Sequence, residues 1–153
     1  MRTILLASDH AGFRLKEELK SYLKKKNFRV EDLGTYSLER CDYPGFAYAL
    51  AKEISKAKYK RGVLICKSGI GSSIVANRVP GVRAALCYNM KAARLSREHN
   101  DSNVLVLGSA FVNGELAKRI LNIWLNTEFL GARHRRRLNT ILKIEKEVKR
   151  WRA

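Results

Sequence analysis

The chain has 153 residues, of which 46% are hydrophobic and 29% charged, a balance typical of a folded domain and not of a disordered chain. No apolar run approaches the about 20 residues that span a membrane, and the short apolar start lacks the form of a signal peptide, so we expect a cytoplasmic protein. The net charge of +17 favours anionic partners, but it does not distinguish phosphorylated metabolites from nucleic acid or a membrane surface.

Short apolar runs alternate with amphipathic stretches along the chain. The runs predict strands, and the spacing of apolar residues between them predicts helices. This alternation is typical of an α/β fold: a single Rossmann-like three-layer domain over residues 1–153, with a five-stranded parallel sheet, helices on both faces and a long C-terminal helix. The expected strands are residues 3–8, 28–33, 62–66, 82–87 and 103–107. The first two expected helices lie around residues 15–23 and at residues 43–54. The third runs from the glycine turn after residue 66 to about residue 78, the fourth follows the fourth strand and ends near residue 98, and the fifth runs from an N-cap at residue 113 to residue 125.

The last segment has the pattern of a long basic helix. Leu138, Leu142 and Trp151 fall on one face, and residues 133–153 contain nine Lys or Arg against two Glu, a local charge of +7. Such a helix could bind nucleic acid or a membrane surface. We favour the commoner alternative, in which it packs on its own domain or on a partner subunit.

Cysteine and histidine spacing argues against a disulfide framework and against a zinc site. The three cysteines form no CxxC pair and cannot all pair within one chain, which is typical of reduced thiols. The three histidines lack the spacing of metal ligands, so we expect no metal. These residues are Cys41, Cys66 and Cys87, and His10, His99 and His134.

A glycine-rich turn follows the third expected strand. That strand ends at Cys66, and residues 67–71 then lead into a helix. Backbone N–H groups of such a turn converge on an anion, and the helix dipole adds positive charge. The same donors favour a thiolate, so a base or nucleophile would lie beside an oxyanion site. The plainer alternative is a buried strand cysteine before a tight turn. Ile74 occupies the place of a third glycine, so NAD binding is only weakly supported.

Ligands of open parallel sheets bind at the carboxyl ends of the strands. Residues 9–10, 66–73 and 99–101 are all expected at or near such ends, or in neighbouring connections. These three segments are therefore the candidate ligand site.

Six distinctive segments occur in order along the chain: residues 8–13, 42–44, 66–74, 76–87, 96–101 and 131–137. Together they resemble the ribose-5-phosphate isomerase type B family, which also includes the galactose-6-phosphate isomerase subunits. The resemblance covers essentially the whole chain. It implies an aldose–ketose isomerisation of a phosphorylated sugar through an enediolate, in the pentose phosphate pathway, without a metal or organic cofactor.

The resemblance also implies roles for individual residues. Cys66 would be the base that moves a proton between C1 and C2, beside the Ser68 hydroxyl. His99, helped by Asp9, would open the sugar ring, for which an imidazole is suited because it titrates near neutrality. A helix cap is the plainer role for Asp9. The enediolate oxygen would be held by the backbone of Lys67, Ser68, Gly69, Ile70 and Gly71.

The remaining groups implied by the resemblance bind the substrate. Asn100 would hold the sugar, and His10, Arg133 and Arg137 would hold the phosphate, which guanidinium groups bind bidentately. In this family the site is built at a dimer interface. We therefore expect a homodimer or homotetramer with shared active sites, with a sugar phosphate as partner and nucleic acid and membrane unlikely.

Two positions depart from the family pattern. Lys67-Ser68 stands where the family usually has Gly-Thr, and Ala110 stands where it often has an arginine near the phosphate. One hypothesis is that Lys67 replaces the missing cation; the alternative is that its side chain faces solvent. Some relatives use a glutamate as base at the position of Val75, a mechanism unavailable here.

These residues favour an enzyme that interconverts ribose 5-phosphate and ribulose 5-phosphate. The nearest alternative is the same chemistry on a six-carbon sugar phosphate such as allose or galactose 6-phosphate. A third reading is a nucleic-acid-binding protein on an inherited isomerase scaffold, suggested by the charge. The presence of Asp9, Cys66, His99 and Asn100 together disfavours that reading.

Overall fold

Within residues 2–153, which the computed structural model describes, five strands form one sheet in the order β2-β1-β3-β5-β4. Every neighbouring pair is parallel, which confirms the parallel sheet predicted from the alternation of strands and helices. The strands are β1 (Thr3–Ser8), β2 (Arg29–Asp32), β3 (Arg61–Cys66), β4 (Ala84–Leu86) and β5 (Val104–Gly108).

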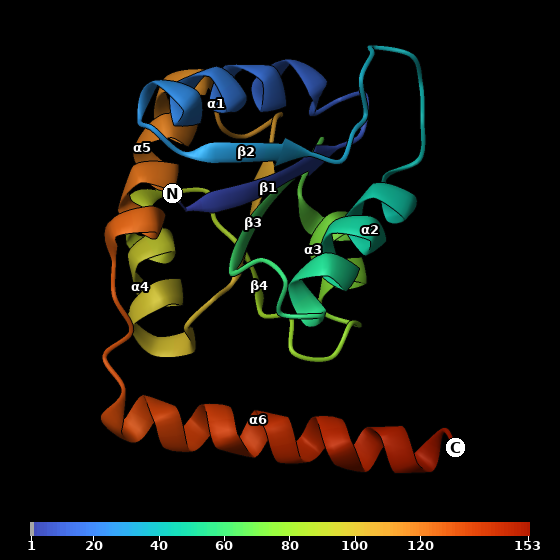
Figure 1. Ribbon diagram of the computed structural model, residues 1–153, viewed down its shortest axis with the longest axis vertical. Coiled ribbons are helices and arrows are strands. Elements are labelled where there is room, and N and C mark those ends of the chain that lie inside the picture. Colours follow the sequence, from blue (N-terminus) through green and yellow to red (C-terminus); the bar gives the residue numbers. More distant parts are fainter. Residues whose placement is uncertain (1) are drawn as a thin grey trace.

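Helices cover both faces of this sheet (Figure 1). Successive strand residues point to opposite faces, so Leu6 enters a core with Trp124 on one side and Leu5 enters a core with Leu50 on the other. The first core lies under α1, α4 and α5 and the second under α2 and α3, which gives the expected three layers. The helices are α1 (Phe13–Lys25), α2 (Tyr43–Ser55), α3 (Ile70–Ala76), α4 (Met90–Asn100), α5 (Gly114–Asn126) and α6 (Ala132–Trp151).

The segment between α3 and β4 differs most from the sequence prediction. α3 ends earlier than expected, because the Asn77 side chain bonds both main-chain groups of Ala84, at 2.8 and 2.9 Å. β4 begins at Ala84 and not at residue 82, because the Arg83 N–H donates to the Asn103 side chain at 2.8 Å instead of joining the ladder. Side-chain hydrogen bonds of this kind compete with regular structure, and the apolar pattern does not report them.

The expected long helix is present, but most of it lies away from the body of the protein (Figure 1). Only His134 and Leu138 of α6 are buried, and the helix packs near the end of α4. Farther along, the Gly81 N–H donates to the Glu145 carboxylate at 3.1 Å. Ile141 and Ile144 are exposed by 42% and 52%, so an apolar stripe remains uncovered in the single chain.

A buried ion pair joins α1 to the end of β2. The Lys16 side chain is completely buried, and its ammonium lies 2.6 Å from the Asp32 carboxylate. Lys20 binds the same carboxylate at 2.7 Å. Burial by itself raises the pKa of Asp32, but hydrogen bonds from Lys16, Lys20 and the Gly34 N–H outweigh burial and lower it. The ionised Asp32 carboxylate therefore contributes fully to the free energy of unfolding at pH values above its ordinary pKa of 3.8. This contribution is lost as the pH falls below 3.8 and the carboxylate becomes protonated.

Asp32→Asn should destabilise the fold, because it leaves the Lys16 ammonium buried without its main partner. We expect the free energy of unfolding at pH 7, measured with urea, to fall by about 3 kcal/mol. The double variant Lys16→Met with Asp32→Asn removes both charges and should recover most of that loss. A double variant no more stable than Asp32→Asn would show that the unpaired ammonium is not the cause.

Candidate functional site

The carboxyl ends of the three central strands gather the first group of predicted residues. β1 leads into Asp9 and His10, β3 ends at Cys66, and the loop after β5 lies next to β3, where the Ser109 N–H donates to the Cys66 carbonyl at 2.9 Å. Asp9 is buried, and its carboxylate accepts from the Gly12 N–H at 3.0 Å. Asp9 thus stabilises the turn that precedes α1, whose own N-cap is Gly12, and presents a carboxylate beside the cysteine strand.

Cys66 lies at the centre of this edge with its thiol against the glycine turn. The side chain is 4% exposed, and the Gly69 N–H donates to Sγ at 3.1 Å. Gly69 has φ +82°, and a Cβ there would overlap Leu86 and the Leu107 backbone, so only glycine fits. The turn thereby holds a backbone donor on the sulfur, which is the arrangement predicted from the sequence.

Two tyrosines that the sequence did not mark as functional brace this turn. The Tyr88 hydroxyl donates to the Ser68 carbonyl at 2.8 Å, and its ring stacks on Phe111 with 4.8 Å between centroids. The ring of Tyr43 covers Gly71, where a Cβ would collide with it. Tyr43 lies in one of the segments that carry the family resemblance, and this was the only feature of the sequence that pointed to it. Tyr88 lies just after such a segment, and no feature of the sequence pointed to it.

His10 is held by the loop between β2 and α2. Its Nδ1 lies 3.0 Å from the Cys41 carbonyl oxygen and 3.2 Å from the Cys41 backbone nitrogen, so this loop is tied to the carboxyl edge. We call Asp9, His10 and residues 66–71 the cysteine half-site. Its members come from β1, β3 and the turns that follow them, as predicted.

The second group of predicted residues does not lie at this edge, so that expectation was wrong. His99 and Asn100 end α4, and residues 101–103 lead from there into the start of β5. A helix that connects parallel strands runs antiparallel to them, so its last residues lie at the amino edge of the sheet. In Figure 1 the end of α4 faces α6, away from the end of β3.

α6 completes a second cluster there. The ring of His99 stacks on that of His134, with 4.2 Å between centroids and 9° between planes. Arg133 and Arg137 belong to the same helix as His134, one residue before it and three after it. Burial lowers the pKa of His134, and the charges of His99 and the two arginines lower it further, against the opposite effect of Glu98. We call His99, Asn100, Arg133, His134 and Arg137 the histidine half-site.

The sequence and the fold agree with those of known enzymes. The chain matches the family model described as Ribose/Galactose Isomerase over residues 4–141. The chain belongs to this family. Ribose-5-phosphate isomerase B of Escherichia coli K12 is 43% identical over 145 residues, which cover 95% of this chain and 97% of that protein. The resemblance predicted from the sequence is confirmed, and the chain is a sugar-phosphate isomerase of the ribose-5-phosphate isomerase B type.

Solved structures of the same type superpose closely. The ribose-5-phosphate isomerase B of Clostridium thermocellum has a TM-score of 0.94 and 46% identity, over 95% of this chain and 99% of that one. The enzyme of Mycoplasma genitalium, solved with bound ribulose-5-phosphate, has a TM-score of 0.92 and 41% identity, over 95% and 97% of the two chains.

The two departures from the family pattern are direct neighbours in the structure. The Ala110 N–H donates to the Lys67 carbonyl at 2.9 Å, and both side chains are exposed at the carboxyl edge. The backbone of residue 67, which carries the lysine side chain, is therefore hydrogen-bonded to the backbone of residue 110. If Lys67 replaces the arginine that the family often has at position 110, the two positions must be neighbours, and they are.

Cys66 is the thiol that the fold places in the half-site. Cys87 lies in the core, where burial raises the pKa of its thiol to about 11, so it is protonated at neutral pH. Cys41 is half-buried beside His10.

Across residues 2–153 no three His, Cys, Asp or Glu side chains lie close enough together to hold a metal ion. No helix in the same residues is long and apolar enough to cross a membrane.

Proposed function

We propose that the chain interconverts ribose 5-phosphate and ribulose 5-phosphate, with Cys66 as the base. The observation that carries this proposal is the thiol at the end of β3, within 3.1 Å of the Gly69 N–H, in an enzyme of this type. The Mycoplasma genitalium relative, at 41% identity, has bound ribulose-5-phosphate. This reaction belongs to the pentose phosphate pathway, and we place it in the cytoplasm, carried out by residues 1–153 as one domain.

The geometry suits proton transfer through an enediolate. The Cys66 thiolate removes the proton from C2 of the open-chain aldose and, as the thiol, returns it to C1. The proton of the C2 hydroxyl moves to the oxygen at C1, so that C1 becomes an alcohol and C2 the ketone. Negative charge grows on the carbonyl oxygen during this step. We assign its stabilisation to backbone N–H groups of residues 67–71, of which the Gly69 N–H donates to Cys66 Sγ and the Ile70 N–H to the Ser68 hydroxyl in the chain without substrate. A donor of this kind is worth about 2.7–4 kcal/mol of barrier.

The separation of the two half-sites supports a shared site between subunits. His99 lies at the amino edge of the sheet, while Cys66 lies at the carboxyl edge, so one chain cannot apply both to one sugar. In a symmetric dimer, each copy presents its histidine half-site to the cysteine half-site of the other. The uncovered apolar stripe of α6, with Ile141 and Ile144, provides surface for such a contact. We therefore propose a homodimer or homotetramer.

Turnover of ribose 5-phosphate by the purified protein in EDTA tests the proposal. We expect ribulose 5-phosphate to form without added metal, because the base and the oxyanion donors all come from the chain. Turnover of allose 6-phosphate or galactose 6-phosphate alone would move the substrate to the six-carbon class. No turnover of any of these sugars, with salt-sensitive RNA binding instead, would overturn the proposal.

Lys67→Gly tests whether the lysine supplies a phosphate-binding cation. We expect KM for ribose 5-phosphate to rise about tenfold with kcat little changed, because a phosphate contact acts equally on the ground and transition states. Adding Ala110→Arg to this variant should restore KM, since position 110 adjoins position 67. Unchanged kinetics in Lys67→Gly would mean that the side chain faces solvent.

A further inference from the structure

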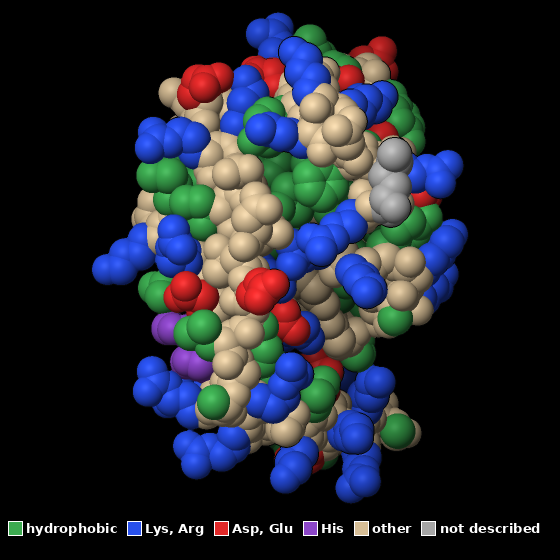
Figure 2. All heavy atoms as spheres, turned by 60° about the vertical axis from the view of Figure 1, so that its left-hand side comes forward, with side chains coloured by type: hydrophobic (Ala, Val, Ile, Leu, Met, Phe, Trp, Pro, Cys, Tyr) green, Lys and Arg blue, Asp and Glu red, His purple; other side chains and the backbone are tan. Residues whose placement is uncertain are grey.

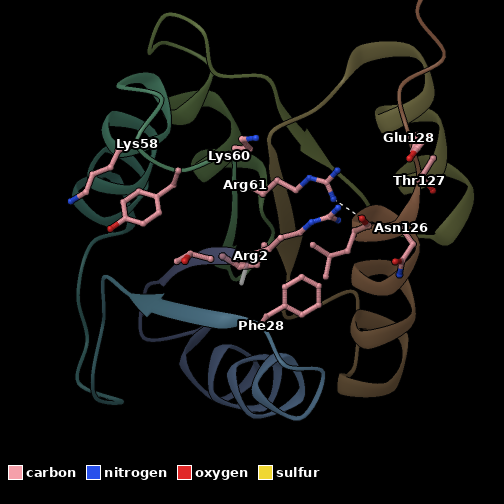
Figure 3. A pocket seen from close by; sticks show the side chains of 12 residues that line it. Arg2, Phe28, Lys58, Lys60, Arg61, Asn126, Thr127 and Glu128 are labelled. Atoms are coloured by element: carbon pink, nitrogen blue, oxygen red, sulfur yellow. Dashed lines mark hydrogen bonds between the residues drawn. The ribbon is translucent and has the colours of Figure 1, made fainter.

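A cavity lies far from the cysteine half-site, at the amino edge of the sheet. It opens between the starts of β1 and β3 and the segments that follow α2 and α5, with a volume of about 650 Å³ (Figure 3). None of its lining residues belongs to either half-site. Ligand pockets commonly have volumes of about 300–1,000 Å³, so this cavity has the capacity for a metabolite.

Positive charge collects on the walls of this cavity, and Lys58 is the one of its cations whose charge is partly offset, by the nearby carboxylates of Glu31 and Glu53. Arg2, Lys58, Lys60 and Arg61 line the cavity, and Glu128 is the acidic residue among them. In the described part of the chain, none of the four cations has a carboxylate oxygen within 4.0 Å. Like charges that gather around a cavity repel one another, and an anion bound between them removes that repulsion.

Arg61 is the fixed member of this group. Its Nη1 donates to the Leu125 carbonyl at 2.6 Å, and its guanidinium lies 5.4 Å from the Trp124 ring centroid. Burial, together with the charges of Arg97 and Arg2, lowers the pKa of Arg61 to about 10, against the opposite effect of Asp101. Asp101 itself already binds Arg83 and Arg97, at 3.4 and 2.9 Å. Arg61 thus stays protonated at neutral pH with no carboxylate of its own.

The two arginines point the same way. Figure 3 shows the guanidinium groups of Arg2 and Arg61 next to each other within the ring of lining residues. Paired guanidinium groups match the oxygens of a phosphate, because each presents a planar fork of N–H donors. The position between them is therefore suited to a phosphate group.

Aromatic surface lines the same cavity. Phe28 and Tyr59 are both half-buried on its walls, and the ammonium of Lys58 lies 5.2 Å from the Tyr59 ring centroid. The Tyr59 hydroxyl donates to the Glu31 carboxylate, which holds this ring in place. Aromatic walls in a cavity that also holds two arginines fit a ligand with a flat apolar part and a phosphate, because such a part stacks on an aromatic face. Inorganic phosphate would leave both rings and most of the volume unused.

We propose that this cavity binds a nucleotide, with its phosphate between Arg2 and Arg61 and its base against Phe28 or Tyr59. The site is separate from the isomerase chemistry and stands whichever sugar the enzyme takes. Figure 2 shows Lys and Arg side chains spread over this side of the molecule, with few Asp and Glu between them. The test must therefore separate the cavity from the general charge of the surface.

Calorimetric titration of the full chain with ATP and with AMP, at about 0.15 M salt, measures the binding. Arg2→Gln with Lys60→Gln removes two exposed cations of the cavity and leaves the anchored Arg61 in place. We expect this variant to weaken nucleotide binding about tenfold. The matched control, Arg119→Gln with Lys52→Gln, loses the same charge from exposed helix positions and should bind within about twofold of the unchanged protein.

Each other outcome counts against the proposal. Equal weakening in the control would mean attraction to the basic surface as a whole. Loss of binding in Arg133→Gln with Arg137→Gln, but not in the cavity variant, would place the nucleotide in the histidine half-site. Inorganic phosphate that binds as tightly as ATP would remove the role of the aromatic walls, and a single-stranded RNA that displaces ATP would indicate nucleic acid. No heat of binding for either nucleotide would overturn the site altogether.

Discussion

Cys66→Ala should lower kcat for ribose 5-phosphate about a thousandfold, because a positioned general base contributes about 10²–10⁴ to a proton transfer. The thiol is the group that the end of β3 brings against the glycine turn, and the Gly69 N–H is already directed at its sulfur. Alanine leaves that turn in place, so substrate binding and KM should change little. Initial rates of ribulose 5-phosphate formation, in EDTA, measure the loss.

Cys87→Ala is the matched control for this experiment. It removes the same sulfur from a buried cysteine of the core, and the raised pKa of that thiol, about 11, makes it unsuited to be a base at neutral pH. This variant should lose some stability and keep its kcat. If Cys66→Ala kept more than about a tenth of the unchanged rate, another group would have to move the proton.

The fold could be predicted because each of its elements follows from local patterns. The apolar runs that predict strands coincide with β1 and β3 to within a residue, and Asn113 caps α5 as expected, accepting from the Leu116 N–H at 2.9 Å. The boundaries around β4 could not be predicted in the same way. They depend on hydrogen bonds of Asn77 and Asn103 with main-chain groups that lie close only in the folded chain.

The candidate site was predictable where strand ends determine it. Asp9 and Cys66 follow parallel strands and therefore share the carboxyl edge. His99 follows a helix, and the same topology places it at the other edge, so the error lay in grouping it with residues that follow strands. Tyr88 holds the Ser68 carbonyl through a contact between segments 20 residues apart, which no local pattern marks.

Mixing two inactive variants should restore activity if the site is shared between subunits. Cys66→Ala disables the cysteine half-site, and His99→Asn disables the histidine half-site. In a mixed symmetric dimer, one site combines the two damaged halves and the other combines the two intact halves. Random pairing makes half of the dimers mixed, so the mixture should recover about one quarter of the unchanged activity.

Cys66→Ala mixed with Asp9→Asn is the matched control, because both changes damage the cysteine half-site and no pairing yields an intact one. Co-expression of the two chains, followed by rate measurement at a fixed protein concentration, makes the comparison direct. Rescue by His99→Asn but not by Asp9→Asn requires that His99 act on the substrate held by a different chain. Absence of rescue in both mixtures would mean that each chain builds its own site, which the opposite placement of Cys66 and His99 on the sheet argues against.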